Sequence, residues 1–285
     1  MKEFFFVRAL LSSLGLILMA MFSIQLGASI AKQLFPVAGA AGTTALRVTM
    51  AAILLSVVAK IWKHNISWKS LPSLAAYGIS LGSMNLLFYF ALERIPLGIA
   101  VALEFTGPLA VALFSSKKSW DILWVLLAGI GIYLLLPVSP STSNLDVIGM
   151  LLALAAGFFW ALYIIFGQKA AKHGTSLQVT AWGMWFATLI ALPGGMYFNS
   201  AEIKDISLWP MGLGIAILSS ALPYSLEMKA MRNMPTKTFG ILMSMEPAVA
   251  TLMGLLVLKE TLTLPQWMAI ACIIAASAGS TATAK

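Results

Sequence analysis

Charged side chains are scarce in this 285-residue chain, because Asp, Glu, Lys and Arg together make up only 10% of it. A soluble domain carries about 25% charged residues, so this composition excludes an ordinary soluble globular protein. Cys272 is the only cysteine, which excludes an intrachain disulfide and a cysteine-based metal cluster. The two histidines, His64 and His173, fall in loops beside lysines. We therefore predict no metal site.

The sequence also lacks the motifs of an enzyme. An enzyme within the membrane needs a nucleophile with its base, a metal cluster or a cofactor motif. No apolar segment contains a histidine, and no Gly-rich phosphate loop followed by Lys is present. The sequence therefore predicts no catalytic residues and no bound cofactor.

Apolar residues are abundant, at 60% of the chain, with a mean hydropathy of +0.92. A run of about 20 apolar residues matches the ~30 Å hydrocarbon core of a bilayer. We expect ten such transmembrane helices, at about 9–31, 40–59, 70–92, 96–115, 122–138, 147–168, 175–198, 208–228, 238–258 and 264–283. The first run continues into the bundle and is predicted to be a retained helix rather than a signal peptide. Short loops predict one compact bundle whose surroundings are the lipid bilayer.

Basic residues are concentrated in the loops of one side of the predicted bundle. That side carries Lys2, Arg8, Lys60, Lys63, Lys69, Lys117, Lys118, Lys169, Lys172, Lys229, Arg232, Lys237 and Lys285. The opposite side carries only Lys32, Arg94, Lys204 and Lys259. The positive-inside rule then places both termini in the cytoplasm. The net charge of +8 is thus explained by topology, and we predict no nucleic-acid partner.

An internal duplication appears at a spacing of 139 to 140 residues. The matching positions are Gly27, Ala31 and Lys32 with Gly167, Ala171 and Lys172, then Ser80, Leu87, Ala91, Pro96, Pro108 and Leu113 with Ser219, Leu226, Ala230, Pro235, Pro247 and Leu252. Five helices per half is an odd number, so the halves must enter the membrane from opposite sides. The predicted fold is an all-α integral membrane protein with two inverted five-helix repeats, residues 1–139 and 140–285, around a central cavity. Such inverted repeats build transporters with a midplane substrate site.

Three charges and two prolines lie deep inside the predicted helices. Glu104 stands alone in an apolar run, Glu246 directly precedes Pro247, and Arg47 lies near the middle of the second span. A charge at the bilayer centre costs roughly 2.5 to 3.5 kcal/mol and faces a bundle interior or a wet cavity. Pro108 and Pro247 occupy equivalent places in the two halves, where each removes a backbone hydrogen bond. We expect these prolines to mark helix breaks or gates.

The three charges admit a structural interpretation and a functional one. Arg47 can serve as a fixed partner of one acid and lock two helices together. However, Arg47 cannot lose its proton, and one cation cannot neutralise two buried acids. The functional hypothesis is therefore a proton-coupled carrier, with Glu104 as the first candidate and Glu246 as the second. Glu227, at the cytoplasmic end of the eighth span, is expected to be an interfacial charge.

Several stretches of the sequence resemble the threonine/homoserine exporters of the drug/metabolite transporter superfamily, which are of the EamA type. The most specific stretches are residues 96–116, 216–228 and 242–248, and the resemblance extends from 23–36 to 275–281. It implies a bacterial inner-membrane exporter of small hydrophilic amino acids such as L-threonine and L-homoserine, working by exchange with protons. It also implies a basket of helices around a central cavity, with spans five and ten at the edge of each half.

The buried residues fit such a substrate. Arg47 is expected to hold the carboxylate of a zwitterionic amino acid through its planar fork, and a deprotonated Glu104 its ammonium. Asn85 or Gln25 would recognise a side-chain hydroxyl, while Tyr89 and Tyr224 would line the cavity. The alternative is an exporter of aromatic amino acids, other metabolites or drugs on the same fold. We expect a monomer or a weak homodimer.

Overall fold

The computed structural model describes residues 2–63, 67–95, 100, 103–115, 119–135, 146–243, 245–246, 248–249 and 263–283. These residues form helices and their connections, without any strand. The α-helices are α1 (Lys2–Ala59), α2 (Leu71–Leu92), α4 (Thr106–Phe114), α5 (Ser119–Leu135), α6 (Val147–Ala170), α7 (Ser176–Phe198), α8 (Ser200–Lys204), α9 (Trp209–Ala216), α10 (Leu222–Met231), α11 (Thr236–Met243) and α13 (Leu264–Ala282). Short 3-10 turns are η1 (Ile61–Lys63), η2 (Ala171–His173) and η3 (Ile206–Leu208), and a π-helical segment, η4 (Ile217–Ala221), joins α9 to α10.

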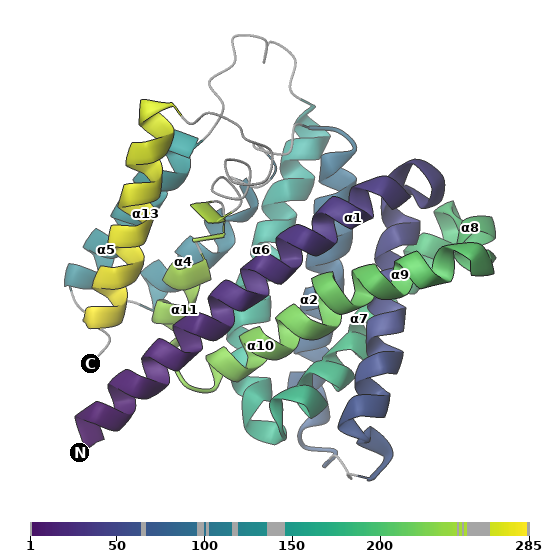
Figure 1. Cartoon of the computed structure of the whole chain (residues 1–285), viewed down its shortest axis with the longest axis horizontal. Helices are drawn as coiled ribbons and strands as arrows, with labels where there is room; N and C mark the ends of the chain where they lie inside the picture. The colour runs from purple at the N-terminus through teal and green to yellow at the C-terminus, as the bar shows by residue number, and fades with distance from the viewer. Residues whose placement is uncertain are drawn as a thin grey trace.

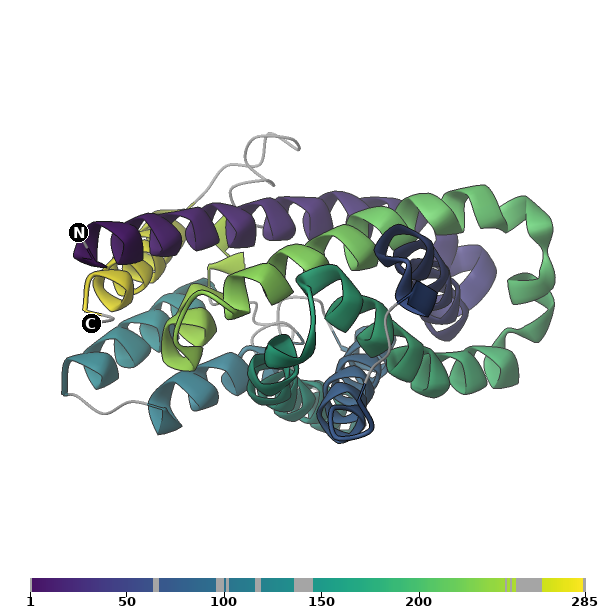
Figure 2. The ribbon, with the colours of Figure 1, turned by 90° about the horizontal axis from the view of Figure 1, so that it is seen from below.

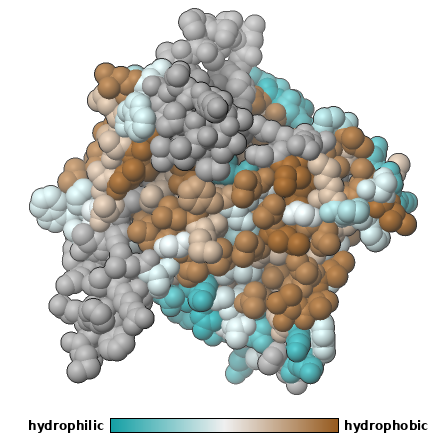
Figure 3. Space-filling view, viewed as in Figure 1, coloured by the Kyte–Doolittle hydropathy of each residue, from teal (hydrophilic) through white to brown (hydrophobic). Residues whose placement is uncertain are grey.

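Five of the described helical segments are long and apolar enough to cross a membrane. They are Leu34–Ala59, Leu71–Leu92, Val147–His173, Ser176–Phe198 and Ile206–Met231, and shorter apolar helices run over Ser12–Gly27, Trp120–Leu134 and Leu264–Ala276. Apolar side chains also cover much of the visible surface (Figure 3). The exposed apolar residues of the protein include Phe114, Tyr133, Leu189 and Tyr197. Exposed apolar area of this extent fits contact with lipid rather than water. The predicted all-α membrane protein is therefore confirmed.

The first two predicted spans are the two arms of α1, which bends sharply at Gly39 (Figure 1). Gly39 has φ +61° and ψ 170°, a conformation that side-chain-bearing residues rarely adopt, and Pro36 lies just before it. Asn199 fills the inside of the bend, where its Oδ1 accepts a hydrogen bond from the Gly42 amide at 3.2 Å. The bend turns the second arm back into the bundle and thereby carries Arg47 inward.

The helices pack in a small number of close pairs. α2 packs against α6 and α7, α1 against α7 and against the continuous α9–η4–α10 helix, α4 against α6 and α11, and α5 against α13. Figure 2 shows α1 and α9–α10 side by side along one flank of the bundle. The pair of α5 and α13 stands apart at the edge of the bundle in Figure 1.

Small residues allow the backbones of neighbouring helices to approach. A Cβ atom added to Gly78 would lie 2.3 Å from the Gly183 carbonyl oxygen, and one added to Gly82 would lie 2.7 Å from that of Ala187. The Gly78-x-x-x-Gly82 spacing therefore forms a close-packing seam between α2 and α7. A similar approach joins α4 to α6, where a Cβ on Gly107 would lie 1.9 Å from the Gly157 carbonyl oxygen.

We expect Gly78→Ala to destabilise the protein by about 1–3 kcal/mol, because the new methyl group overpacks the seam. Gly214→Ala is the matched control, since a Cβ there meets no atom within 4 Å. Chemical unfolding of both purified variants in detergent would measure the difference. Equal stability of the two variants would contradict the proposed backbone contact.

Asp146 caps the start of α6. Its Oδ1 accepts from the amides of Ile148 at 2.7 Å and Gly149 at 3.1 Å, and Arg94 Nη1 donates to its Oδ2 at 2.9 Å. The hydrogen bond from the Gly149 amide, followed by that from Arg94, lowers the pKa of Asp146. This stabilisation is present above the ordinary pKa of Asp and is lost as the pH falls through the lowered value.

Asp146→Asn should remove this acid-sensitive part of the stability while keeping a capping side chain. We expect the melting temperature of the wild type to exceed that of the variant at neutral pH and the gap to narrow in acid. Thermal unfolding of both proteins between neutral pH and pH about 3 would show this. A gap that does not change with pH would contradict the assignment.

Candidate functional site

Arg47 is the centre of a buried polar network. It lies on the second arm of α1 and is only 3% exposed. Its Nη1 donates to the Ser219 carbonyl at 3.1 Å and to the Ser220 hydroxyl at 3.2 Å, and its Nη2 donates to Asn85 Oδ1. The guanidinium carbon also lies 5.1 Å from the centre of the Tyr89 ring. All of these partners are neutral.

A proline explains why the Ser219 carbonyl is available to Arg47. Pro223 has no backbone N–H and cannot donate to the carbonyl four residues before it, which is that of Ser219. The helix takes up this defect as the π-helical segment η4, which contains both serines. Local π segments of this kind occur frequently at functional sites. Here the segment turns a backbone carbonyl and two hydroxyls toward a buried cation.

Asn85 connects Arg47 to Tyr224. The Asn85 amide nitrogen donates to the Leu81 carbonyl at 2.8 Å and to the Tyr224 hydroxyl at 3.0 Å. The first bond fixes Asn85 to its own helix, α2, and the second reaches α10. Helices α1, α2, η4 and α10 therefore meet around one guanidinium.

Tyr224 continues into a second buried group. Its ring lies 5.9 Å from that of Tyr163, which in turn lies 5.3 Å from that of Tyr77. The Tyr163 hydroxyl donates to Glu227 Oε2 at 2.7 Å, and Glu227 is 1% exposed. The expectation that Glu227 is an interfacial charge is therefore wrong, because α10 turns this side chain into the bundle rather than toward the surface.

Glu104 and Glu246 form a separate acidic pair. Glu104 is 7% exposed, lies just before α4 and interacts electrostatically with Glu246. Pro108 falls in the first turn of α4, where the missing N–H would have met the Glu104 carbonyl. That carbonyl faces Gly157 of α6, where a Cβ would lie only 2.6 Å away. Pro247 lies outside the described residues, so its predicted role has no structural counterpart here.

The predicted binding residues thus fall into two groups. Arg47, Asn85, Tyr89 and Tyr224 come together, whereas no ion pair among the described residues joins Arg47 to Glu104 or Glu246. Gln25 is partly buried on the first arm of α1. Its neighbour Ser23 donates to the Leu218 carbonyl at 2.5 Å, so this stretch packs on η4 next to the serines that hold Arg47.

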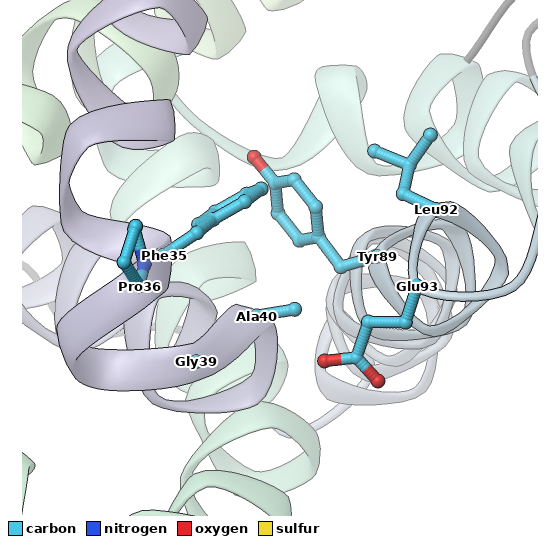
Figure 4. A pocket seen from close by; sticks show the side chains of 7 residues that line it. All are labelled: Phe35, Pro36, Gly39, Ala40, Tyr89, Leu92 and Glu93. Atoms are coloured by element: carbon cyan, nitrogen blue, oxygen red, sulfur yellow. The ribbon is translucent and has the colours of Figure 1, made fainter. Parts of the chain in front are cut away.

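A pocket of about 410 Å³ lies beside this network, between the bend of α1 and the end of α2 (Figure 4). It is lined by Phe35, Pro36, Gly39, Ala40, Tyr89, Leu92 and Glu93. The Tyr89 ring meets Phe35 edge-on at 5.2 Å and reaches Arg47 as well, so it stands between the pocket and the guanidinium. Glu93 supplies an exposed carboxylate at the rim, which Figure 4 shows turned toward the bend.

Comparisons with known proteins show which family the chain belongs to. A sequence profile of the EamA-like transporter family matches residues 147–282. The threonine/homoserine exporter RhtA of Escherichia coli (strain K12) is 51% identical over 271 residues, which cover 95% of this chain and 91% of that protein. The RhtA of Salmonella typhimurium (strain LT2) is 50% identical over 94% of this chain and 91% of its own. The chain belongs to the EamA-like transporter family.

This membership confirms the resemblance seen in the sequence, and the protein is a transporter rather than an enzyme. A crystal structure of a protein 19% identical in sequence superposes with a TM-score of 0.77 over 97% of both chains. That likeness shows the shared fold alone. The substrate and the coupling ion must therefore be inferred from the residues of this transporter.

Sequence reasoning missed two features of the site. It treated Glu227 as an interfacial residue, although Glu227 accepts a buried hydrogen bond from Tyr163. It also did not anticipate the π segment. The spacing of Ser219 and Pro223, four residues apart, was the available signal, because it leaves one carbonyl without its helical donor.

We expect Tyr89→Leu to lower the free energy of unfolding by about 0.5–2 kcal/mol, the value of a cation–π contact with Arg47. Tyr89→Phe keeps the aromatic face and should stay close to the wild type. Tyr133→Leu, at a 72% exposed site, is the control for the loss of an aromatic residue. Equal unfolding curves for the Leu and Phe variants of Tyr89 would exclude the contact.

Proposed function

We propose that this protein exports small hydrophilic amino acids, L-threonine and L-homoserine, across the bacterial inner membrane. The observation that carries the proposal is 51% identity over 95% of the chain to a protein named threonine/homoserine exporter. Five membrane-length helices and a buried polar network support it. Of the functions that the network permits, transport of a zwitterion accounts best for a buried cation with neutral partners.

The guanidinium of Arg47 is the proposed carboxylate site. Its Nε has no hydrogen-bond partner among the described residues, and no described carboxylate forms an ion pair with it. A buried Arg without a counterion is an expensive feature unless an anion visits it. A substrate carboxylate can displace neutral serine and amide partners from Arg47 at a much lower free-energy cost than it could displace an ionised acid. The planar fork would then bind both carboxylate oxygens.

The neighbours of Arg47 would recognise the rest of the substrate. We propose that Asn85, Tyr224 and Gln25 offer hydrogen bonds to a side-chain hydroxyl such as that of threonine. Tyr89 would close the site toward the 410 Å³ pocket. A pocket of this size falls within the range typical of small-molecule sites.

We also propose ten transmembrane helices in two inverted repeats, residues 1–139 and 140–285. Equivalent helices would be the first arm of α1 with α6, its second arm with α7, α2 with α9–α10, and α5 with α13. Helices α4 and α11 would lie in the equivalent fourth and ninth spans. A twofold relation between the repeats requires each contact to have an equivalent. The contacts support this, because α5–α13 and α1–α7 each pair equivalent helices, α4–α11 joins the equivalent fourth and ninth spans, and α2–α6 corresponds to α9–α10 on α1.

Contact between equivalent residues gives further support. Asn85 and Tyr224 are 139 positions apart, which is the spacing of the duplication, and they share a hydrogen bond. Two equivalent residues can touch only near the axis that relates the repeats. The proposed substrate site would therefore lie on that axis, where inverted-repeat transporters place theirs.

The proposed orientation places both termini in the cytoplasm. The observed contacts between loops agree with this orientation, because each joins loops that are predicted to lie on the same side of the membrane. On the predicted cytoplasmic side, Ser70 contacts His173, and Lys237 forms an ion pair with Asp121 at 2.8 Å. On the opposite side Arg94 pairs with Asp146. No described ion pair mixes the two sides.

Exchange with protons is the proposed energy source. Glu104 is a buried carboxylate and Glu246 a half-buried one; they interact electrostatically and flank the predicted helix breaks at Pro108 and Pro247. Two carboxylates that interact inside a membrane favour binding of a proton by one of them. We propose that these breaks let the acids change their access as the repeats rock.

Counterflow in proteoliposomes would test the substrate. Labelled threonine should accumulate against unlabelled threonine or homoserine and should respond to an imposed pH gradient. The aromatic pocket wall of Phe35 and Tyr89 favours one alternative, an apolar or aromatic substrate. Stronger competition by tryptophan or a cationic dye than by homoserine would support that alternative and contradict ours.

Arg47→Ala should raise the half-saturation concentration for threonine roughly 10- to 100-fold. A hydrogen bond to a charged group contributes about 1.5–3 kcal/mol, and 1.4 kcal/mol corresponds to a tenfold change. Arg47→Lys should fall between the variant and the wild type, since it keeps the charge but not the fork. Arg94→Ala, which removes an exposed cation, is the control. Half-saturation within twofold of the wild type for folded Arg47→Ala would refute the carboxylate site.

A further inference from the structure

The 410 Å³ pocket between the bend of α1 and the end of α2 has one charged group in its lining. That group is the Glu93 carboxylate, which lies at the rim. Most of the remaining wall is apolar and includes Phe35, Pro36 and Leu92. Pockets of this kind orient a small molecule through a few polar groups while apolar walls cover the rest of it. The lining therefore favours a ligand that joins a positive group to an uncharged body.

The Glu93 carboxylate is available to such a ligand. No ion pair in the described part of the chain includes it, because the neighbouring cation, Arg94, pairs with Asp146 at 2.9 Å. Figure 4 shows the carboxylate turned from the end of α2 toward the bend of α1 at Gly39. An ammonium group in the pocket would thus meet an acid that has no cation of its own.

The neighbouring Tyr89 ring directs a cation toward Glu93. The two residues lie one helical turn apart, and the Glu93 amide donates to the Tyr89 carbonyl at 3.3 Å. Residues at this spacing lie on the same face of a helix, so the ring and the carboxylate both reach the pocket. The guanidinium of Arg47 already lies 5.1 Å from the ring centre. A second cation at the same ring would be repelled by the first, which leaves Glu93 as the favoured position.

We propose that this pocket is a second, outer binding site for the transported amino acid, in which Glu93 binds the ammonium group. Phe35 and Tyr89 cover the side chain. The inference rests on the proposed function and on its orientation, which places the end of α2 on the outer side of the membrane. Arg47 lies beyond the Tyr89 ring, so the pocket has a negative rim and a positive inner end. A zwitterion in the pocket therefore points its ammonium group outward and its carboxylate inward.

The outer site would lie on the exit path of the substrate. An amino acid released by Arg47 passes Tyr89 and is then held at the rim before it leaves. An exposed carboxylate binds an ammonium group weakly, so this step does not trap the substrate. A compound with an ammonium group and no carboxylate would bind the outer site without binding Arg47. Such a compound separates the two sites in an experiment.

Thiol labelling of right-side-out membrane vesicles is the direct test. Cys272 is the only cysteine, so Leu92→Cys in a Cys272→Ser protein places a single thiol in the pocket wall. Threoninol, which has an ammonium group but no carboxylate, should slow labelling of this thiol by a membrane-impermeant maleimide. N-acetylthreonine, which has a carboxylate but no ammonium group, should not. Ser207→Cys, at an exposed site on η3, is the control whose labelling neither compound should change.

Glu93→Gln should raise the threoninol concentration that gives half protection roughly 1.5- to 5-fold, the range of an exposed ion pair. Glu93→Asp should recover part of this loss. The effect should shrink as salt is added, because an exposed charge is screened. Glu202→Gln, on the short helix α8, is the control for removal of another acid on the same side. Unchanged protection in Glu93→Gln, or equal protection by N-acetylthreonine, would overturn the proposal.

Arg47→Ala distinguishes the outer site from the proposed substrate site. Protection by threoninol should persist in this variant, and its loss would place the ligand at Arg47 and overturn the inference. If the protein transports neither threonine nor homoserine, the proposed function fails separately, and protection by threoninol still decides whether the pocket binds an ammonium group. If Leu92→Cys does not reach the membrane, Phe35→Cys reports from the α1 side of the pocket. A folded reporter that the maleimide cannot label from outside would contradict an outward-facing site.

Discussion

The fold is organised around the need to satisfy a guanidinium inside hydrocarbon. Arg47 cannot lose its proton, so burying it in the bundle requires hydrogen-bond partners on the helices that surround it. A serine carbonyl, a serine hydroxyl and an amide provide them, from η4 and α2, while an aromatic face covers one side. None of these groups is charged, and the site therefore keeps a net positive charge. The proposed carboxylate site requires such an uncompensated charge, whereas a closed ion pair would only join two helices.

Two helix defects make this arrangement possible. The bend at Gly39 folds α1 back on itself and brings its second arm against α7, with Asn199 packed into the bend. The π segment before Pro223 provides a carbonyl that a regular helix would have used internally. Such defects are tolerated at membrane depth only where protein or water meets the exposed backbone. In this protein Arg47 donates a hydrogen bond to the exposed Ser219 carbonyl. The carbonyl gains a donor and the guanidinium gains an acceptor, so each group lowers the free-energy cost of burying the other.

Much of the fold was predictable because a segment that crosses the lipid must be long and apolar. Segments long and apolar enough to span the membrane were expected where α2, α6, α7 and α9–α10 lie. Arg47, Asn85, Tyr89 and Tyr224 were expected at the site from polarity and depth, and they meet there. Glu227 was misplaced because hydropathy locates a residue along a helix but not around it. A rotation of half a turn separates an interfacial acid from a buried one, and that rotation is fixed by the packing of α10 against α1, α7 and α6.

Sequence alone determined that the chain is a helical membrane protein, which segments are apolar enough to span, and that one permanent cation lies among them. These are local properties that follow from composition and run length. The tertiary structure decided which groups surround that cation, since Asn85, Ser219 and Tyr224 are far apart in the chain and come together only when α2 and α10 pack with α1. It also decided that Arg47 and the Glu104–Glu246 pair are separate, because charge type predicts attraction but helix geometry sets the distance.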